Sequence, residues 1–168
     1  MGKEQNTDEL AAERSDVKVV TTVTGPNQYK IDATATFDSA PAKVWALLWD
    51  WERLLDVGLP GLTSDFKWLS GGPDEVPSTF QFEMAGATIK EEIYLRKVTA
   101  DQYRLCYRAE PALGILEYDA VLVLQPIPEA RTTFSATREV RLAPEMAPDM
   151  LAEMVESETN SLREYFAE

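Results

Sequence analysis

Most of the chain carries the alternation of apolar and polar residues that is typical of half-buried β-strands. A segment rich in β-branched residues at 17–24 is followed by a turn at 25–28. Short turns separate most of the later segments, so we expect an antiparallel meander. The alternation predicts a sheet of six to seven strands, at residues 29–37, 64–70, 78–84, 88–99, 102–109, 116–125 and 131–142.

Two short helices are expected after the first of these strands. Ser39 is a suitable N-cap and Pro41 suits a first helical turn, so a helix starts here. Apolar residues then follow with helical spacing as far as Trp49, and a second short helix begins at Asp50. Gly58 marks its end, because glycine is a poor helix former.

The chain ends with one amphipathic helix at residues 148–166. A long helix that follows an antiparallel run must cover the concave side of the sheet, because neither surface buries itself alone. We therefore expect an α+β fold in which a strongly curved sheet wraps around this helix and leaves a cavity between the two. The apolar face of the helix carries Leu151, Val155, Leu162 and Phe166, with Met154 and Tyr165 beside it.

The 168 residues carry a formal net charge of −13, which limits the class of partner. Phosphate binding requires an excess of Lys and Arg, so we expect no nucleic-acid partner and no docking on anionic membranes. No apolar run approaches the roughly 18 residues that span a bilayer, so we expect no membrane insertion. Residues 1–16 are polar, and we expect a disordered tail before a single domain at residues 17–168 of a cytoplasmic protein. The oligomeric state stays open.

The sequence contains no histidine. This excludes Ser-His-Asp and Cys-His catalysis and the usual zinc and non-haem iron ligand sets. A Mg²⁺ or Ca²⁺ site made only of carboxylates stays open, but the sequence has no EF-hand loop and no paired Asp motif, so we expect neither a metal nor a cofactor. The one cysteine, Cys106, has no second cysteine for an internal disulfide and lies in a strand segment.

Five segments occur in a distinctive order: FDSAPAKVWALLWDWERL (37–54), WLSGGPDEV (68–76), TIKEEIYL (88–95), LEYDAVLVLQP (116–126) and the C-terminal helix. The Pro-Ala-x-x-Val-Trp motif in the first segment is the most specific of them. Together they resemble the START-related, birch-pollen-allergen-like (SRPBCC) superfamily, and most closely its bacterial polyketide cyclase/dehydrase-like branch. The resemblance implies a helix-grip fold and an internal cavity for a small molecule.

Glu91 is the first candidate for chemistry in this cavity. Alternation along residues 88–96 places it on the same inward face as Ile89 and Ile93. In the resembling family, an acidic residue at this place often faces the ligand. A buried carboxyl would have a raised pKa and would act as a general acid or base near neutral pH, or would only bind a ligand hydroxyl. The alternative is a solvated position at the rim.

Two tyrosines and a second acidic residue are further candidates. Tyr107 and Tyr118 carry hydroxyls at the ends of apolar bodies, which suits them for orienting a ligand or protonating an enolate. Core tyrosines bonded to a backbone carbonyl would show the same pattern. Glu158 lies one turn after Met154, next to the apolar stripe of the last helix, where it faces either the cavity or water.

The inward face of the strand at 131–142 is ambiguous. Phe134, Ala136 and Val140 favour the even positions, whereas the spacing of the resembling family favours Thr137, which we select. Turn 85–87 and loop 110–114 are expected to flank the cavity entrance. The candidate catalytic residues are Glu91 and Tyr118, and the candidate ligand-binding residues are Trp68, Phe80, Phe82, Met84, Glu91, Ile93, Leu105, Tyr107, Tyr118, Thr137, Leu151, Met154, Val155 and Glu158.

Three functions fit this interpretation. The leading one is binding of a hydrophobic or amphipathic small molecule, lipid-like or polyketide-like, in the cavity. The second is a cofactor-free polyketide cyclase/aromatase or dehydratase that uses Glu91. The third is a protein-interaction domain with a filled core, whose interface would include Trp49, Trp51 and Leu59 if these residues are exposed.

Overall fold

The computed structural model describes residues 17–167, which form one antiparallel sheet and three helices. The sheet has the strand order β1-β2-β8-β7-β6-β5-β4-β3, and every neighbouring pair is antiparallel. All neighbours are consecutive in the sequence except β2 and β8. The tail that the sequence predicts at residues 1–16 lies outside the described residues. The strands are β1 (Lys18–Gly25), β2 (Gln28–Phe37), β3 (Thr63–Ser70), β4 (Ser78–Met84), β5 (Ala87–Val98), β6 (Tyr103–Ala109), β7 (Ile115–Ile127) and β8 (Arg131–Leu142).

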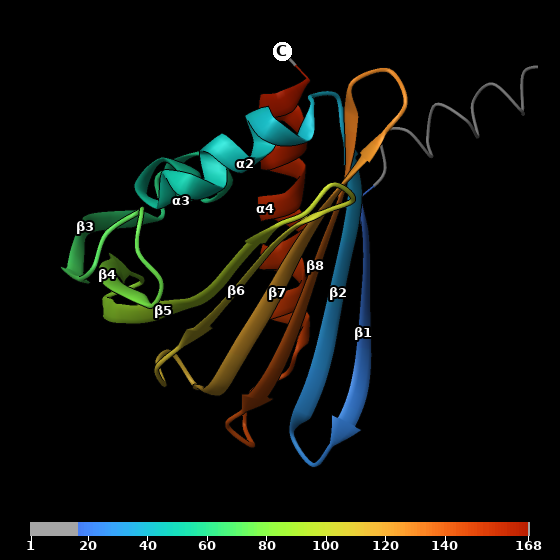
Figure 1. The fold of residues 1–168 in the computed structure, drawn as a ribbon. Coiled ribbons are helices and arrows are strands. Elements are labelled where there is room, and N and C mark those ends of the chain that lie inside the picture. The colour runs from blue at the N-terminus through green and yellow to red at the C-terminus, as the bar shows by residue number, and fades with distance from the viewer. Residues whose placement is uncertain (1–16, 168) are drawn as a thin grey trace, which may run out of the picture.

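The three helices lie on one face of this curved sheet (Figure 1). They are α2 (Pro41–Trp49), α3 (Trp51–Gly58) and α4 (Asp149–Phe166). The long helix α4 packs against β1 and β2 on one side and against α3 on another. The main strand contacts of α4 are therefore with β1 and β2, while Trp51 at the start of α3 packs on Phe80 of β4 and Tyr107 of β6.

The helix-grip fold expected from the sequence is confirmed. The sheet has eight strands rather than six or seven, because the β-branched segment at the start pairs along most of its length with β2 and forms an edge strand. The two short helices consequently follow the second strand. The α4 stripe is buried as its spacing predicts, at Leu151, Val155, Leu162 and Phe166.

Ser39 joins α2, α4 and β8 at one end of the core. Its hydroxyl donates a hydrogen bond to the carbonyl oxygen of Phe166 (3.1 Å), and its carbonyl accepts one from Thr132 Oγ1 (2.6 Å). Ser39 is therefore not the N-cap that the sequence suggested. Ala40 occupies the cap position and provides no side-chain hydrogen bond, since the Ser39 hydroxyl serves a tertiary contact instead.

Two further properties follow from the described part of the chain. None of its helices combines the length and the apolar character required to cross a membrane. Residues 17–167 also contain no group of three or more His, Cys, Asp or Glu side chains arranged to hold a metal ion.

Candidate functional site

A cavity of about 90 Å³ lies between the sheet and the helices α3 and α4. Its position follows from the packing of α4 against β1 and β2, which leaves room above β5, β6 and β7. Most of its lining is apolar, and its polar lining is concentrated on a few residues. The apolar and aromatic part consists of Leu48, Trp51, Leu54, Leu55, Leu59, Phe82, Met84, Ile89, Ala109, Ala112, Leu113, Ile115, Leu122, Phe134, Met154 and Leu162; the polar part consists of Glu91, Tyr107, Glu110, Tyr118, Arg138 and Glu158.

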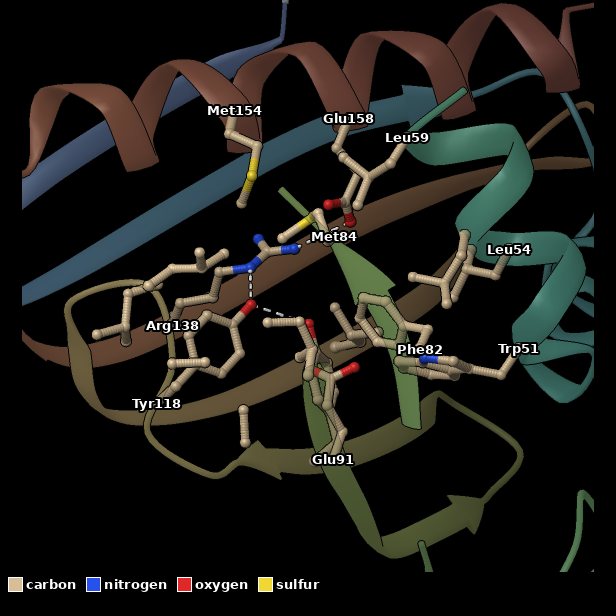
Figure 2. Close-up of a pocket in the computed structure, with 18 of the residues that line it drawn as sticks. Trp51, Leu54, Leu59, Phe82, Met84, Glu91, Tyr118, Arg138, Met154 and Glu158 are labelled. Carbon is tan, nitrogen blue, oxygen red and sulfur yellow. Dashed lines mark hydrogen bonds and ion pairs between the residues drawn. The ribbon is translucent and has the colours of Figure 1, made fainter. Parts of the chain in front are cut away.

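Polar side chains from the neighbouring strands β5 to β8 and from α4 converge on one place in the cavity (Figure 2). Glu91 on β5, Ala109 on β6 and Tyr118 on β7 are paired in register, so their side chains stand in one row across the sheet. Ala109 is small and leaves space between the two polar neighbours. Arg138 projects into the same space from β8, where it is paired with Ala120 of β7.

Arg138 is the centre of the hydrogen-bond network. Its side chain is 2% exposed, and its Nε donates to the Tyr118 hydroxyl at 2.7 Å. Its Nη2 donates to Glu158 Oε1 at 3.2 Å, which forms an ion pair between β8 and α4. The hydroxyls of Tyr118 and Tyr107 are 3.0 Å apart and share one hydrogen bond. Figure 2 shows the guanidinium below Met154, with Tyr118 and Glu158 on either side.

Glu91 has a strongly perturbed acidity. Burial, and secondly repulsion from Glu158, raise its pKa from 4.5 to about 8, against smaller opposing effects of Arg138 and Trp51. Protein surrounds the carboxyl, although part of the residue's surface faces the cavity. Glu91 is therefore mostly a neutral acid at pH 7 and becomes a carboxylate as the pH rises through about 8. A pKa this close to neutral suits a general acid or base.

The two tyrosines are neutral in this environment. Burial is the main cause that raises the pKa of Tyr107 well above its ordinary value, and burial likewise raises the pKa of Tyr118. For Arg138, burial would lower the pKa, but Tyr118, Tyr107 and Glu158 raise it well above its ordinary value. Near pH 7 the cluster thus contains one cation and one carboxylate partner, with Glu91 and both tyrosines mainly protonated.

The structure brings half of the candidate residues together at the cavity. Phe82, Met84, Glu91, Tyr107, Tyr118, Met154 and Glu158 line it, whereas Trp68, Phe80, Ile93, Leu105, Thr137, Leu151 and Val155 do not. The loop after β6 contributes as expected through Glu110, Ala112 and Leu113. No residue of turn 85–87 belongs to the lining.

Thr137 is the clearest error, because it faces away from the cavity. Its hydroxyl donates a hydrogen bond to Asp32 Oδ1 on β2 at 2.8 Å. The even positions of β8 point inward, as Phe134 and Ala136 indicated, and this parity places Arg138 in the cavity. The sequence interpretation missed Arg138, although its position on the apolar face of the strand was a usable signal.

The other absent candidates belong to the solid part of the core. Trp51 packs on Phe80 with ring centroids 5.4 Å apart, and Trp68 packs on Phe80 at the same spacing, so these rings fill the region beside the cavity. Four further candidates also lie in the buried core away from the lining. These are Ile93, Leu105, Leu151 and Val155.

The family of the chain is established by comparison with known proteins. Residues 28–167 match the family described as polyketide cyclase/dehydrase and lipid transport, and the chain belongs to this family. The superfamily expected from the sequence is thereby confirmed. No curated protein matches the chain significantly.

Solved structures share the fold at low sequence identity. A solution NMR structure from Thermobifida fusca is 21% identical, with a TM-score of 0.66, and the match covers 82% of this chain and 93% of that one. Norcoclaurine synthase from Thalictrum flavum is 16% identical, with a TM-score of 0.57 and coverages of 86% and 94%. A human lipid transfer and protein localization domain is 11% identical, with a TM-score of 0.60 and coverages of 96% and 95%. One of these relatives is thus named as a synthase and another as a lipid transfer domain.

Proposed function

We propose that this protein binds a hydrophobic or amphipathic small molecule in the cavity between the sheet and the helices α3 and α4. The observation that carries the proposal is a mostly apolar lining with one polar cluster, built around Arg138, at its sheet side. Such a lining is typical of ligand pockets, in which apolar contacts provide affinity and a few polar groups fix orientation. The family also includes lipid transport in its description.

The cavity must enlarge to hold such a ligand. Its volume of about 90 Å³ has room for a few water molecules, whereas ligand pockets measure roughly 300–1,000 Å³. The lining contains side chains that adapt easily: Met84 and Met154 are unbranched and have several rotatable bonds. Leu113 lies in the loop after β6 and is partly exposed, so its movement opens a path to solvent without breaking a strand.

A fluorescent probe tests this proposal directly. The neutral, apolar N-phenyl-1-naphthylamine increases its emission when it leaves water, and saturable binding to the full chain is the expected result. Candidate lipids or polyketide-like compounds should then displace the probe. Absence of saturable binding of any apolar probe, together with a crystal structure in which side chains fill the cavity, would refute the proposal.

A second function is favoured by the acidity of Glu91. A carboxyl with a pKa of about 8 beside two tyrosine hydroxyls is suited to proton transfer in a cofactor-free cyclase or dehydratase reaction. Here Glu91 would exchange a proton with the substrate carbon or hydroxyl, and the tyrosines would hydrogen-bond the developing oxyanion. The resting protonation at pH 7 makes Glu91 a general acid first and a base at higher pH.

The substitution Glu91→Gln separates the two functions. In a carrier, the variant keeps its ligand with a modest loss of affinity, because the amide preserves the shape of the side chain. In a cyclase or dehydratase, the variant binds the substrate and loses turnover by about a hundredfold or more. Of the residues expected at a protein-interaction surface, Trp51 and Leu59 are buried. Trp49 is 36% exposed with Arg96 packed over its ring, so the three residues form no common exposed surface.

A further inference from the structure

We propose that the polar end of the cavity recognises an acceptor oxygen, a ketone or a carboxylate, on a ligand that has no hydrogen-bond donor of its own at that end. This inference rests on the proposed binding function and names the ligand chemistry. Its basis is a surplus of hydrogen-bond donors over acceptors among the side chains that meet at Arg138.

The tyrosine pair supplies the first surplus donor. Tyr107 and Tyr118 have two hydroxyl protons between them, but they share a single hydrogen bond. The Tyr118 oxygen already accepts from Arg138 Nε. Whichever tyrosine donates to the other, one O–H proton is left with no acceptor among the described residues. This conclusion does not depend on where the hydroxyl hydrogens are placed.

Arg138 supplies the second surplus. A guanidinium carries five N–H donors and no acceptor. The described partners of Arg138 use Nε and Nη2, whereas Nη1 is buried and has no hydrogen-bond partner within residues 17–167. Leaving a buried donor of a charged group without an acceptor is costly, because the group has lost its hydrogen bonds to water. A ligand oxygen that accepts from Nη1 would remove this cost.

Trp51 and Glu91 add to the imbalance. Trp51 is 3% exposed, and its buried indole N–H has no acceptor at good hydrogen-bond geometry among the described residues. The N–H faces Glu91 and lowers the pKa of that carboxyl, so a stronger acceptor on a ligand could take its place. Glu91 carries a proton near pH 7 because burial raises its pKa to about 8, so it is itself a donor. The only charged acceptor in the cluster, Glu158, already accepts from Arg138.

From this surplus of donors we expect the cavity to bind some polar groups and to reject others. A ketone or carboxylate oxygen has two lone pairs and can accept from Arg138 and from the free tyrosine hydroxyl at once. An ammonium group has only donors, so it cannot accept from Arg138 Nη1 or from the tyrosine hydroxyl, and the Arg138 cation would repel it. It would have to share the one charged acceptor of the cluster, Glu158, with Arg138. A primary alcohol can both donate and accept, so it should fall between the two.

A series of ligands with one chain length tests the inference. Octan-2-one, octanoate, octan-1-ol and octylamine share an eight-carbon chain and differ in the polar group. Each is titrated at pH 7 against the full chain loaded with N-phenyl-1-naphthylamine. We expect octan-2-one and octanoate to displace the probe at concentrations about tenfold or more below octylamine, since hydrogen bonds to a charged group contribute about 1.5–3 kcal/mol.

Two variants test whether the side chains around Arg138 cause the preference for a ketone or carboxylate over an amine. Arg138→Met should reduce the preference for the ketone and the carboxylate to less than threefold. Arg141→Met is the matched control, because Arg141 lies on the outer face of the same strand and pairs with Glu117, and it should keep the full preference. If Arg138→Met fails to fold, Tyr107→Phe removes the surplus hydroxyl with little change in shape and should weaken the ketone about threefold.

The possible outcomes distinguish this inference from the function on which it rests. If octylamine displaces the probe as well as octan-2-one does, the donor surplus does not select the ligand, although the cavity still binds one. If Arg141→Met loses the preference as fully as Arg138→Met, the selection does not come from the cavity. If the probe itself shows no saturable binding, both the inference and the binding function are wrong.

Discussion

Arg138 on β8 and Glu158 on α4 form an ion pair at 3.2 Å that connects the sheet to the C-terminal helix across the cavity. The two partners differ in exposure, since the side chain of Arg138 is 2% exposed and that of Glu158 is 22% exposed. Because Arg138 lies on β8 and Glu158 on α4, the pair holds the sheet and the helix together at the cavity proposed for the ligand. It also makes the stability of the fold and the polarity of the cavity depend on the same residues.

Loss of Arg138 should destabilise the protein. The variant Arg138→Met leaves Glu158 without its partner, but Glu158 is exposed enough to be rehydrated, so the loss should be about 1–3 kcal/mol rather than the larger penalty of a fully buried pair. Urea denaturation measures the free energy of unfolding. A double-mutant cycle with Glu158→Gln should give a coupling energy of about 1 kcal/mol or more.

Arg141→Met provides the comparison for this measurement. Arg141 pairs with Glu117 at the same 3.2 Å, but both side chains are exposed. An exposed ion pair contributes about 0–1 kcal/mol, so this variant should lose much less stability. Equal losses for the two variants would show that the Arg138 pair is not specially important for the fold.

The stability of the protein should decrease as the pH rises from about 5 to 8. In the folded state Glu91 keeps its proton until pH 8, whereas in the unfolded chain it loses the proton near its ordinary pKa of 4.5. The folded state therefore binds more protons within this window, and each pH unit costs at most about 1.4 kcal/mol. Glu91→Gln removes this dependence, so its stability relative to the natural chain should increase with pH. Urea denaturation at several pH values between 5 and 8 measures this trend.

Glu92→Gln is the control for the pH series. Glu92 is the next residue on β5, faces outward and pairs with Arg108. Its replacement should leave the slope between pH 5 and 8 unchanged. A Glu91→Gln variant with the same slope as the natural chain would mean that Glu91 is ionised in the folded protein at neutral pH.

Gly114, in the loop beside the cavity, should not tolerate alanine. Its φ angle is +80°, and a Cβ built there overlaps the sulfur of Met146. Gly86 has nearly the same φ of +79° but open space around it. Gly86→Ala should cost about 1 kcal/mol for the backbone conformation alone, whereas Gly114→Ala should cost at least a further 1 kcal/mol for the displaced methionine. Equal losses in urea denaturation would contradict this account.

The sequence predicted the fold well because its signals are local. The alternation in residues 88–96 correctly placed Glu91 on the inward face, and the spacing of Leu151, Val155, Leu162 and Phe166 correctly identified the buried stripe of α4. Only the edge strand β1 was left out of the strand count. Its residues are β-branched but mostly exposed, so they carry little alternation.

The site was less predictable because it depends on tertiary packing. Alternation shows which residues face inward, but it does not show which inward residues meet a gap and which meet another side chain. Ile93 and Leu105 face inward and are fully buried in the solid core. α4 packs on β1 and β2, and in this arrangement Met154 and Glu158 line the cavity whereas Leu151 does not. Arg138 was missed because the family spacing was preferred to the alternation of the strand itself.

The most direct test of the cavity as the binding site is the affinity of N-phenyl-1-naphthylamine for the variant Ala109→Leu. Ala109 lies between Glu91 and Tyr118 in the register of the sheet and lines the cavity, so the larger side chain fills the available space. The same substitution at the exposed residue Ala42 on α2 is the control. We predict that Ala42→Leu binds the probe as the natural chain does, while Ala109→Leu remains folded and binds it at least tenfold more weakly. Saturable binding of equal affinity to a folded Ala109→Leu variant would contradict the account, because the probe would then bind elsewhere.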